Sequence, residues 1–267
     1  MSDLLRADYY KIKKDIILFI ALILVVFFAL STPALYLLLE KLIEDSLDEL
    51  GGMGFGIAFS GKFVFMSTLS VTNNIGLILP VLMGILVCRD FSTGTVRNKI
   101  IAGHSRLQVY LSLLISAVSI GATLFLIYSL LMLALGSLLL GYGSDFNSSE
   151  LIYILKVLLM GTLMFSAMIS IGVFFAAATR SIGITIVLQI ALGMVIAILG
   201  SIPMMLIDCP EWLEQLTRLN PAYQLTLLTA SDKLPTDLLI TSLLSSAAYI
   251  VLSAAAGSLI LRRAELK

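Results

Sequence analysis

The sequence predicts an all-α integral membrane protein that crosses the bilayer six times. Of its 267 residues, 59% are hydrophobic and 13% are charged, whereas a soluble domain carries about 25% charged residues. The mean hydropathy is +1.05. Six separate apolar runs are each long enough to cross a hydrocarbon core about 30 Å thick. Because water must face the outside of a soluble fold, this composition is typical of a protein dissolved in lipid.

The six predicted spans follow one another along a single transmembrane domain, residues 1–267. Polar or charged segments separate them, except that a tight turn at residues 179–181 lies between the fourth and the fifth. The predicted spans are residues 16–39, 69–88, 107–140, 150–179, 182–207 and 238–261.

Residues 3–14 are predicted to form an amphipathic helix at the membrane surface, ahead of the first span. Leu5, Tyr9, Ile12 and Ile16 recur at the spacing of one helical face, with basic residues elsewhere on the wheel. The alternative is a plain basic flank before a membrane helix. The first apolar run is too long for a signal peptide and no small-residue cleavage site follows it, so we expect a retained anchor.

Lysines and arginines predict the orientation of the spans. With the N-terminus inside, twelve of these residues fall on the cytoplasmic side and four on the outer side, with Lys156 uncounted near a boundary. Cytoplasmic loops of membrane proteins carry the excess of positive residues. We therefore expect both termini to be cytoplasmic.

Neither a catalytic nor a metal site is predicted. Residues 56–62 have the spacing of a phosphate-binding loop, but Phe63 stands where a Ser or Thr should reach magnesium, and no strand precedes it. The one histidine, His104, has no neighbouring ligands. The six apolar cores contain no acidic residue, which argues against an intramembrane protease or an ion-coupled transporter. Because the net charge is zero, we expect no nucleic-acid partner.

A few polar and small residues inside the spans suggest how the helices pack. Asn73, Asn74 and Gln189 are expected either to line a polar path or to form interhelical hydrogen bonds. Ser253 and Gly257 form a small-xxx-small pair that lets helix backbones approach closely. This pair predicts a packing face in the last span, within the chain or with a second copy.

The loop between the second and third spans, residues 89–106, is predicted to form a short, rigid, basic helix at the cytoplasmic surface. Ser92 or Thr93 suits its N-cap, and Gly103 suits its end. The alternative is an ordinary positive-inside loop that happens to be structured.

One face of this short helix is apolar. Val96 and Ile100 share it at i and i+4, while Arg97 and Lys99 lie off it. The spacing therefore predicts an amphipathic helix.

The loop resembles that of the permease subunits of type 2 ATP-binding-cassette (ABC) transporters, the class that includes bacterial exporters of peptides and antibiotics. The opening residues 4–11, the outer segment 212–223 and the basic pair Arg262–Arg263 also resemble this family. Asp90 stands where the family often has Glu, which keeps the charge. The loop residues that carry the resemblance are Asp90, Gly94, Thr95, Arg97, Asn98, Lys99, Gly103, Ser105 and Arg106.

The resemblance implies that the chain is a transport subunit with neither enzyme activity nor a cofactor of its own. A separate cytoplasmic ATPase subunit would bind the ATP, and both the loop and the N-terminal surface helix would contact that subunit. The coupling residues so implied are Asp90, Gly94, Thr95, Val96, Arg97, Lys99, Ile100, Gly103 and Arg106.

The resemblance also implies an assembly and a cargo. Two permeases, identical or related, would enclose a path through the bacterial cytoplasmic membrane for export of a peptide, an antibiotic or another amphipathic substrate. The alternative is a stand-alone secondary transporter or channel. That alternative would favour inverted repeats and a charged midplane, and the sequence contains neither in recognisable form.

Overall fold

The computed structural model describes residues 1–49, 59–70, 74–143, 146–205, 210–230 and 236–263. Over these residues the chain forms α-helices and no β-strand. Six of the helices are long and apolar enough to cross a membrane. The predicted fold class, an all-α multi-pass membrane protein, is therefore confirmed.

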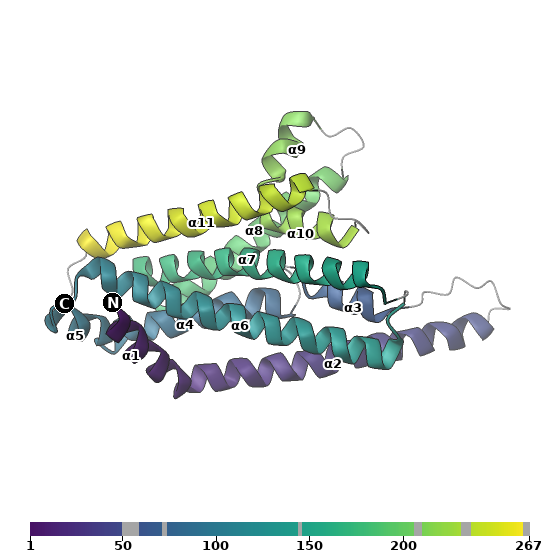
Figure 1. Cartoon of the computed structure of the whole chain (residues 1–267), viewed down its shortest axis with the longest axis horizontal. Coiled ribbons are helices and arrows are strands. Elements are labelled where there is room, and N and C mark those ends of the chain that lie inside the picture. The colour runs from purple at the N-terminus through teal and green to yellow at the C-terminus, as the bar shows by residue number, and fades with distance from the viewer. Residues whose placement is uncertain (50–58, 71–73, 144–145, 206–209, 231–235, 264–267) are drawn as a thin grey trace.

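The six long helices run lengthwise through the molecule (Figure 1). Three of them form the centre of the bundle, because α4, α6 and α7 each pack against four of the other long helices. The six are α2 (Ile16–Glu49), α4 (Asn74–Ser92), α6 (Arg106–Leu140), α7 (Ser148–Thr179), α8 (Ile182–Met205) and α11 (Thr236–Arg263).

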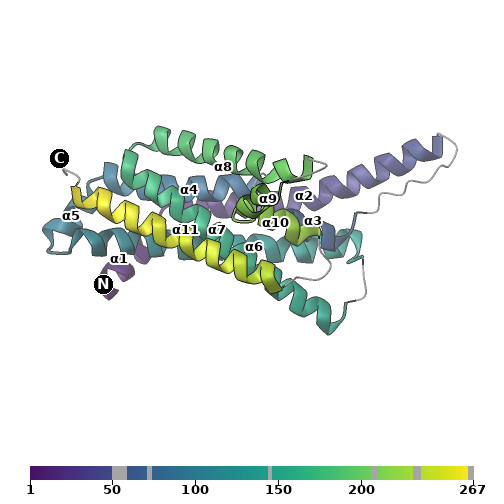
Figure 2. The ribbon, with the colours of Figure 1, turned by 90° about the horizontal axis from the view of Figure 1, so that it is seen from above.

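Five short helices lie at the two ends of this bundle. One end holds α1 (Ser2–Lys13) and α5 (Thr95–Ile101), together with the start of α6 and the end of α11 (Figures 1 and 2). Toward the other end lie α3 (Gly61–Ser67), α9 (Glu211–Thr217) and α10 (Pro221–Ala230). The first and last helices thus meet at one end of the bundle, as an even number of spans requires.

Two predicted spans have the wrong boundaries. The first was expected to end at residue 39, but α2 continues to Glu49 and projects beyond its neighbours (Figure 2). Hydropathy marks only the part of a helix that lies in lipid, whereas Glu, Lys and Leu continue a helix in water equally well.

The second was expected at residues 69–88, but α4 runs from Asn74 to Ser92, so Arg89 and Asp90 belong to a span and not to the loop. Leu69 instead follows the short helix α3 and is fully buried. In the fifth predicted span, residues 206–207 lie outside the described residues.

Close packing in the bundle depends on glycines. A Cβ added at Gly257 of α11 would lie 2.1 Å from the hydroxyl oxygen of Tyr110 on α6. The Tyr110 hydroxyl donates a hydrogen bond of 3.1 Å to the Ser253 carbonyl oxygen. The predicted small-residue face of the last span therefore packs within the chain, where Ser253 and Gly257 contact the side chain of Tyr110.

Between their ends, the outer sides of α2, α8 and α11 are mostly apolar. Large side chains on these helices leave half or more of their surface exposed in the single chain, among them Phe19, Phe27, Val187, Val195 and Leu252. Such surface suits lipid tails, which have the same polarity.

Candidate functional site

The short helix α5 is shaped by a glycine at each end. Gly94 precedes it with φ +70° and Gly103 follows it with φ +92°, values that L side chains rarely adopt. Gly103 therefore ends the helix as predicted. The predicted N-cap is wrong, because Gly94 occupies that position, and the Thr93 hydroxyl instead donates to the Arg89 carbonyl oxygen (2.8 Å).

Val96 and Ile100 do share one face of α5, but that face is turned into the protein. Val96 is only 1% exposed and belongs to the main hydrophobic core, against which Ile100 also packs. Val96 therefore anchors α5 to the bundle and is not available to a partner. The residues that face away are Arg97, Asn98 and Ile101, and the Ile101 side chain is 72% exposed.

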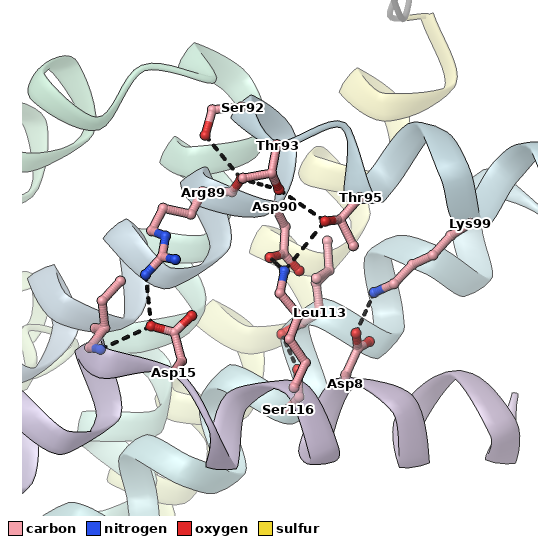
Figure 3. Close-up of polar contacts among 12 residues, drawn as sticks. Asp8, Asp15, Arg89, Asp90, Ser92, Thr93, Thr95, Lys99, Leu113 and Ser116 are labelled. Carbon is pink, nitrogen blue, oxygen red and sulfur yellow. Dashed lines mark hydrogen bonds and ion pairs between the residues drawn. The ribbon is translucent and has the colours of Figure 1, made fainter.

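Three ion pairs join the N-terminal segment to the ends of α4 and α5, and we call these six residues the ion-pair clamp (Figure 3). The Asp8 and Asp90 side chains are almost wholly buried. Arg89 Nη1 lies 2.7 Å from Asp15 Oδ1. The three pairs are Lys99 with Asp8, Lys11 with Asp90, and Arg89 with Asp15.

Further hydrogen bonds hold the side chains of the ion-pair clamp in place. The Ser112 hydroxyl on α6 donates to the second oxygen of Asp8 (2.6 Å). Lys11 also donates to the Thr95 hydroxyl oxygen (3.4 Å), at the first residue of α5. Asp15 accepts a bond from the Ile17 amide (2.9 Å) at the start of α2. The clamp thus joins α1, α2, α4, α5 and α6 at one end of the bundle.

The order of charges in the clamp fixes how α1 sits. Along the chain the N-terminal segment carries Asp8, Lys11 and Asp15, while the facing residues are Lys99, Asp90 and Arg89. The signs alternate on both sides, so sliding α1 by one turn would bring like charges together. Misplaced buried charges are costly, and this pattern therefore favours a single register.

Arg106 ties the start of α6 to the end of α11. Its Nη1 donates to the carbonyl oxygens of Leu261 (3.1 Å) and Arg262 (2.7 Å), which belong to the last turn of α11. A cation suits these carbonyls, since a helix C-terminus carries partial negative charge. Ser105 and Gln108 form a capping box at the same corner of the molecule. Arg106 therefore has a structural position beside α5.

Of the predicted path residues, the structure describes the side chain of Gln189 alone. It is 6% exposed, and its amide lies against the backbones of Gly172 on α7 and Gly84 on α4. Its Oε1 is buried without a hydrogen-bond partner among the described residues. Asn73 lies outside the described residues, and Asn74 begins α4 with a side chain that is not described. A path-lining role for these residues stays a prediction.

A second charged cluster lies at the opposite end of the bundle. Lys62 Nζ donates to Glu150 Oε1 (2.9 Å), and the Tyr142 hydroxyl donates to Glu150 Oε2 (3.1 Å). Burial, together with the Glu150 charge, raises the pKa of Tyr142 to about 12, so the hydroxyl keeps its proton. Residues 56–58 lie outside the described residues, but Lys62 at the end of that motif is engaged by a carboxylate.

Sequence reasoning missed most of the ion-pair clamp. Asp8 lies one helical turn from both Leu4 and Ile12, and all three are buried on the same face of α1. An acidic residue on the apolar face of an amphipathic helix indicates a buried ion pair, and this signal was present in the sequence. Its partner, Lys99, is 91 residues away along the chain, which a one-dimensional pattern does not reveal.

Within the described residues, no three His, Cys, Asp or Glu side chains gather in a way that could hold a metal ion. Comparison with protein-family models finds no match to the chain. Comparison with curated proteins finds none either.

Proposed function

We propose that the chain is the transmembrane subunit of an ABC transporter and that a separate ATPase subunit drives it. One observation carries this proposal: α5 exposes Arg97, Asn98 and Ile101 beyond the bundle while its other face is fixed to the protein. A lone exposed isoleucine flanked by polar residues suits the centre of a small protein interface, which combines an apolar anchor with a polar rim.

The ion-pair clamp supports a role in transmission. A force on α5 reaches α4 and α6 through the backbone, and it reaches α1 through the Lys99–Asp8 and Lys11–Asp90 pairs. Rigid units that move together convert a local displacement into a rearrangement of helices. On this account ATP binding by the partner shifts the population between two arrangements of the spans. The resemblance of the loop to the family supports the same role.

The proposed location is the bacterial cytoplasmic membrane, with both termini and α5 in the cytoplasm. Two features support this orientation: the excess of Lys and Arg on that side, and the position of α1, α5 and the end of α11 at one end of the bundle. The proposed cargo is a peptide, an antibiotic or another amphipathic molecule. It would pass between two permease subunits.

The proposal is tested by isolating the tagged chain in mild detergent, identifying co-eluting proteins and measuring ATP hydrolysis. The double variant Arg97→Glu, Ile101→Asp should lose the ATPase, because it places charge on the exposed side of α5. The matched control is Lys41→Glu, Leu42→Asp, which makes the same kinds of change on an exposed part of α2. This control should retain the ATPase.

Two results would count against the proposal, each against a different part. A cassette ATPase that stays bound to the Arg97→Glu, Ile101→Asp variant would show that α5 is not the docking element. A chain that elutes alone and moves solutes in liposomes without ATP would favour a secondary transporter or channel.

A further inference from the structure

The two faces of α1 have opposite character. The inward face buries Leu4, Asp8 and Ile12. The outward face exposes three cations, Arg6, Lys13 and Lys14, together with Tyr10 and one carboxylate, Asp3, and the Tyr10 side chain is 63% exposed. Lys14 donates a hydrogen bond of 2.6 Å to the Tyr10 hydroxyl oxygen, while Arg6 and Lys13 bond to none of the described residues. The clamp neutralises the charges of the inward face, so the outward face carries the positive charge of the helix.

The position of α1 against α6 shows where this outward face points. Asp8 accepts a hydrogen bond from Ser112, and Tyr9 bonds to Ser119, so α1 packs on the flank of α6 and not beneath its end. The 35 residues of α6 span about 52 Å, which exceeds a 30 Å core by roughly 22 Å. Ser119 lies about 20 Å from the start of α6 at 1.5 Å per residue. The outward face of α1 therefore points sideways, and it lies at the boundary of the hydrocarbon core when the excess length of α6 is at this end of the bundle.

The start of α2 gives the same level independently. Ile16 and Phe19 are each 64% exposed, and Ile20 is 43% exposed. The apolar outer surface therefore begins only two or three residues after Lys13 and Lys14. Since lipid tails cover that surface, the basic residues just before it lie among the headgroups.

We infer that the outward face of α1, formed by Arg6, Tyr10, Lys13 and Lys14, binds the headgroups of anionic lipids. Three cations suit phosphate-bearing lipids of net negative charge, and a tyrosine at this depth places its ring and hydroxyl in the interface. The inward face holds the helix in one register, so the cations are presented together. Anionic lipid would then hold α1 at the membrane surface, whether or not an ATPase is bound.

The test uses the purified full chain alone and titrates it with phosphatidylglycerol or phosphatidylcholine, counting bound lipids by native mass spectrometry. The test variant is Arg6→Gln, Lys13→Gln, which changes the two cations that bond to none of the described residues. Each basic residue near an anionic surface contributes about fivefold in affinity, so the dissociation constant for phosphatidylglycerol should rise on the order of 25-fold. Binding of phosphatidylcholine should stay unchanged.

The control variant is Arg97→Gln, Arg262→Gln, which removes the same charge from exposed residues at the same end of the bundle. It should bind phosphatidylglycerol within about a factor of five of the native chain, the contribution of a single basic residue. Thermal unfolding of each variant confirms that it has folded.

Equal binding of phosphatidylglycerol by the native chain and by Arg6→Gln, Lys13→Gln would overturn the inference. So would equal affinity of the native chain for both lipids. If Arg6→Gln, Lys13→Gln keeps the lipid in this titration and loses the ATPase in the separate co-purification, the outward face of α1 belongs to the protein partner instead. Because the titration contains no ATPase, its result does not depend on the proposed transport function.

Discussion

Buried charges at one end of the bundle are the residue-scale feature on which the rest depends. Asp8 is 2% exposed and Asp90 is 4% exposed, yet each is paired with a lysine on a different helix. An isolated charge in such surroundings would cost several kcal/mol, and ion pairing with further hydrogen bonds offsets that cost. The carboxylates therefore favour one position of α1, because any other position would leave a buried charge without its partner.

The first prediction concerns the Lys99–Asp8 pair. Asp8→Ala leaves Lys99 buried without its carboxylate and should lower the free energy of unfolding by about 3–5 kcal/mol. Asp3→Ala removes an exposed carboxylate from the same helix and should cost less than about 1 kcal/mol. Unfolding in lipid bicelles measures both. Equal losses for the two variants would contradict the clamp.

The second prediction concerns the contact between Tyr110 and Gly257. Gly257→Ala places a methyl group 2.1 Å from the tyrosine oxygen and should destabilise the fold by about 1–3 kcal/mol. The control is Gly183→Ala on α8, where a Cβ meets nothing within 4 Å and the change should be neutral or stabilising. Thermal unfolding compares the two. A Gly257→Ala variant as stable as the native chain would show that α6 and α11 pack differently.

At the scale of elements, the long apolar helices and the short helices α1 and α5 could be predicted, whereas α3, α9 and α10 could not. Each span contains a window of 18 residues with high mean hydropathy and at most two charged residues. Lipid enforces the helix there because backbone groups have no other hydrogen-bond partner. The short helices α3, α9 and α10 depend instead on contacts with distant parts of the chain. For example, the Gly61 amide at the start of α3 donates to the Gly141 carbonyl oxygen (2.7 Å), at the end of α6.

For α5, the sequence pattern predicts the helix itself but not the orientation of its two faces. Its existence, its end at Gly103 and the shared face of Val96 and Ile100 could be predicted from spacing alone. Which face looks outward could not, because an apolar stripe suits a partner protein and the core of the same chain equally well. In the folded chain Val96 packs into the core, and Ile101 is the apolar residue of α5 that stays exposed.

The third prediction separates the two faces of α5. Val96→Ala removes core methyl groups and should lower the free energy of unfolding by about 1–2 kcal/mol while leaving ATPase binding intact. Ile101→Ala should have the opposite profile, with unchanged stability and weaker binding. Thermal unfolding and co-purification of the same two variants give the comparison. Loss of the ATPase from folded Val96→Ala protein would be inconsistent with this division of roles.

At the scale of the whole molecule, α1, α5 and the end of α11 share one end of the bundle, with a second charged cluster at the other (Figure 1). We propose from the positive-inside pattern that the membrane face at α1 and α5 is the cytoplasmic one.

The fourth prediction tests that assignment. In a background without Cys88 and Cys209, the variant Arg97→Cys should react with a membrane-impermeant maleimide in inverted vesicles only. Phe146→Cys, at a side chain 61% exposed between α6 and α7, should react in intact cells only. Reaction of both cysteines from the same side would contradict the six-span topology.

The central claim is that the exposed side of α5 binds an ATPase subunit. Its most direct test is a photo-crosslinking amino acid placed at position 101 in living cells. The account predicts a crosslink from position 101 to a protein that carries the sequence motifs of a cassette ATPase. Position 96, buried on the same helix, should give none. A crosslink from position 96 instead, or no cassette ATPase at position 101, would contradict the account.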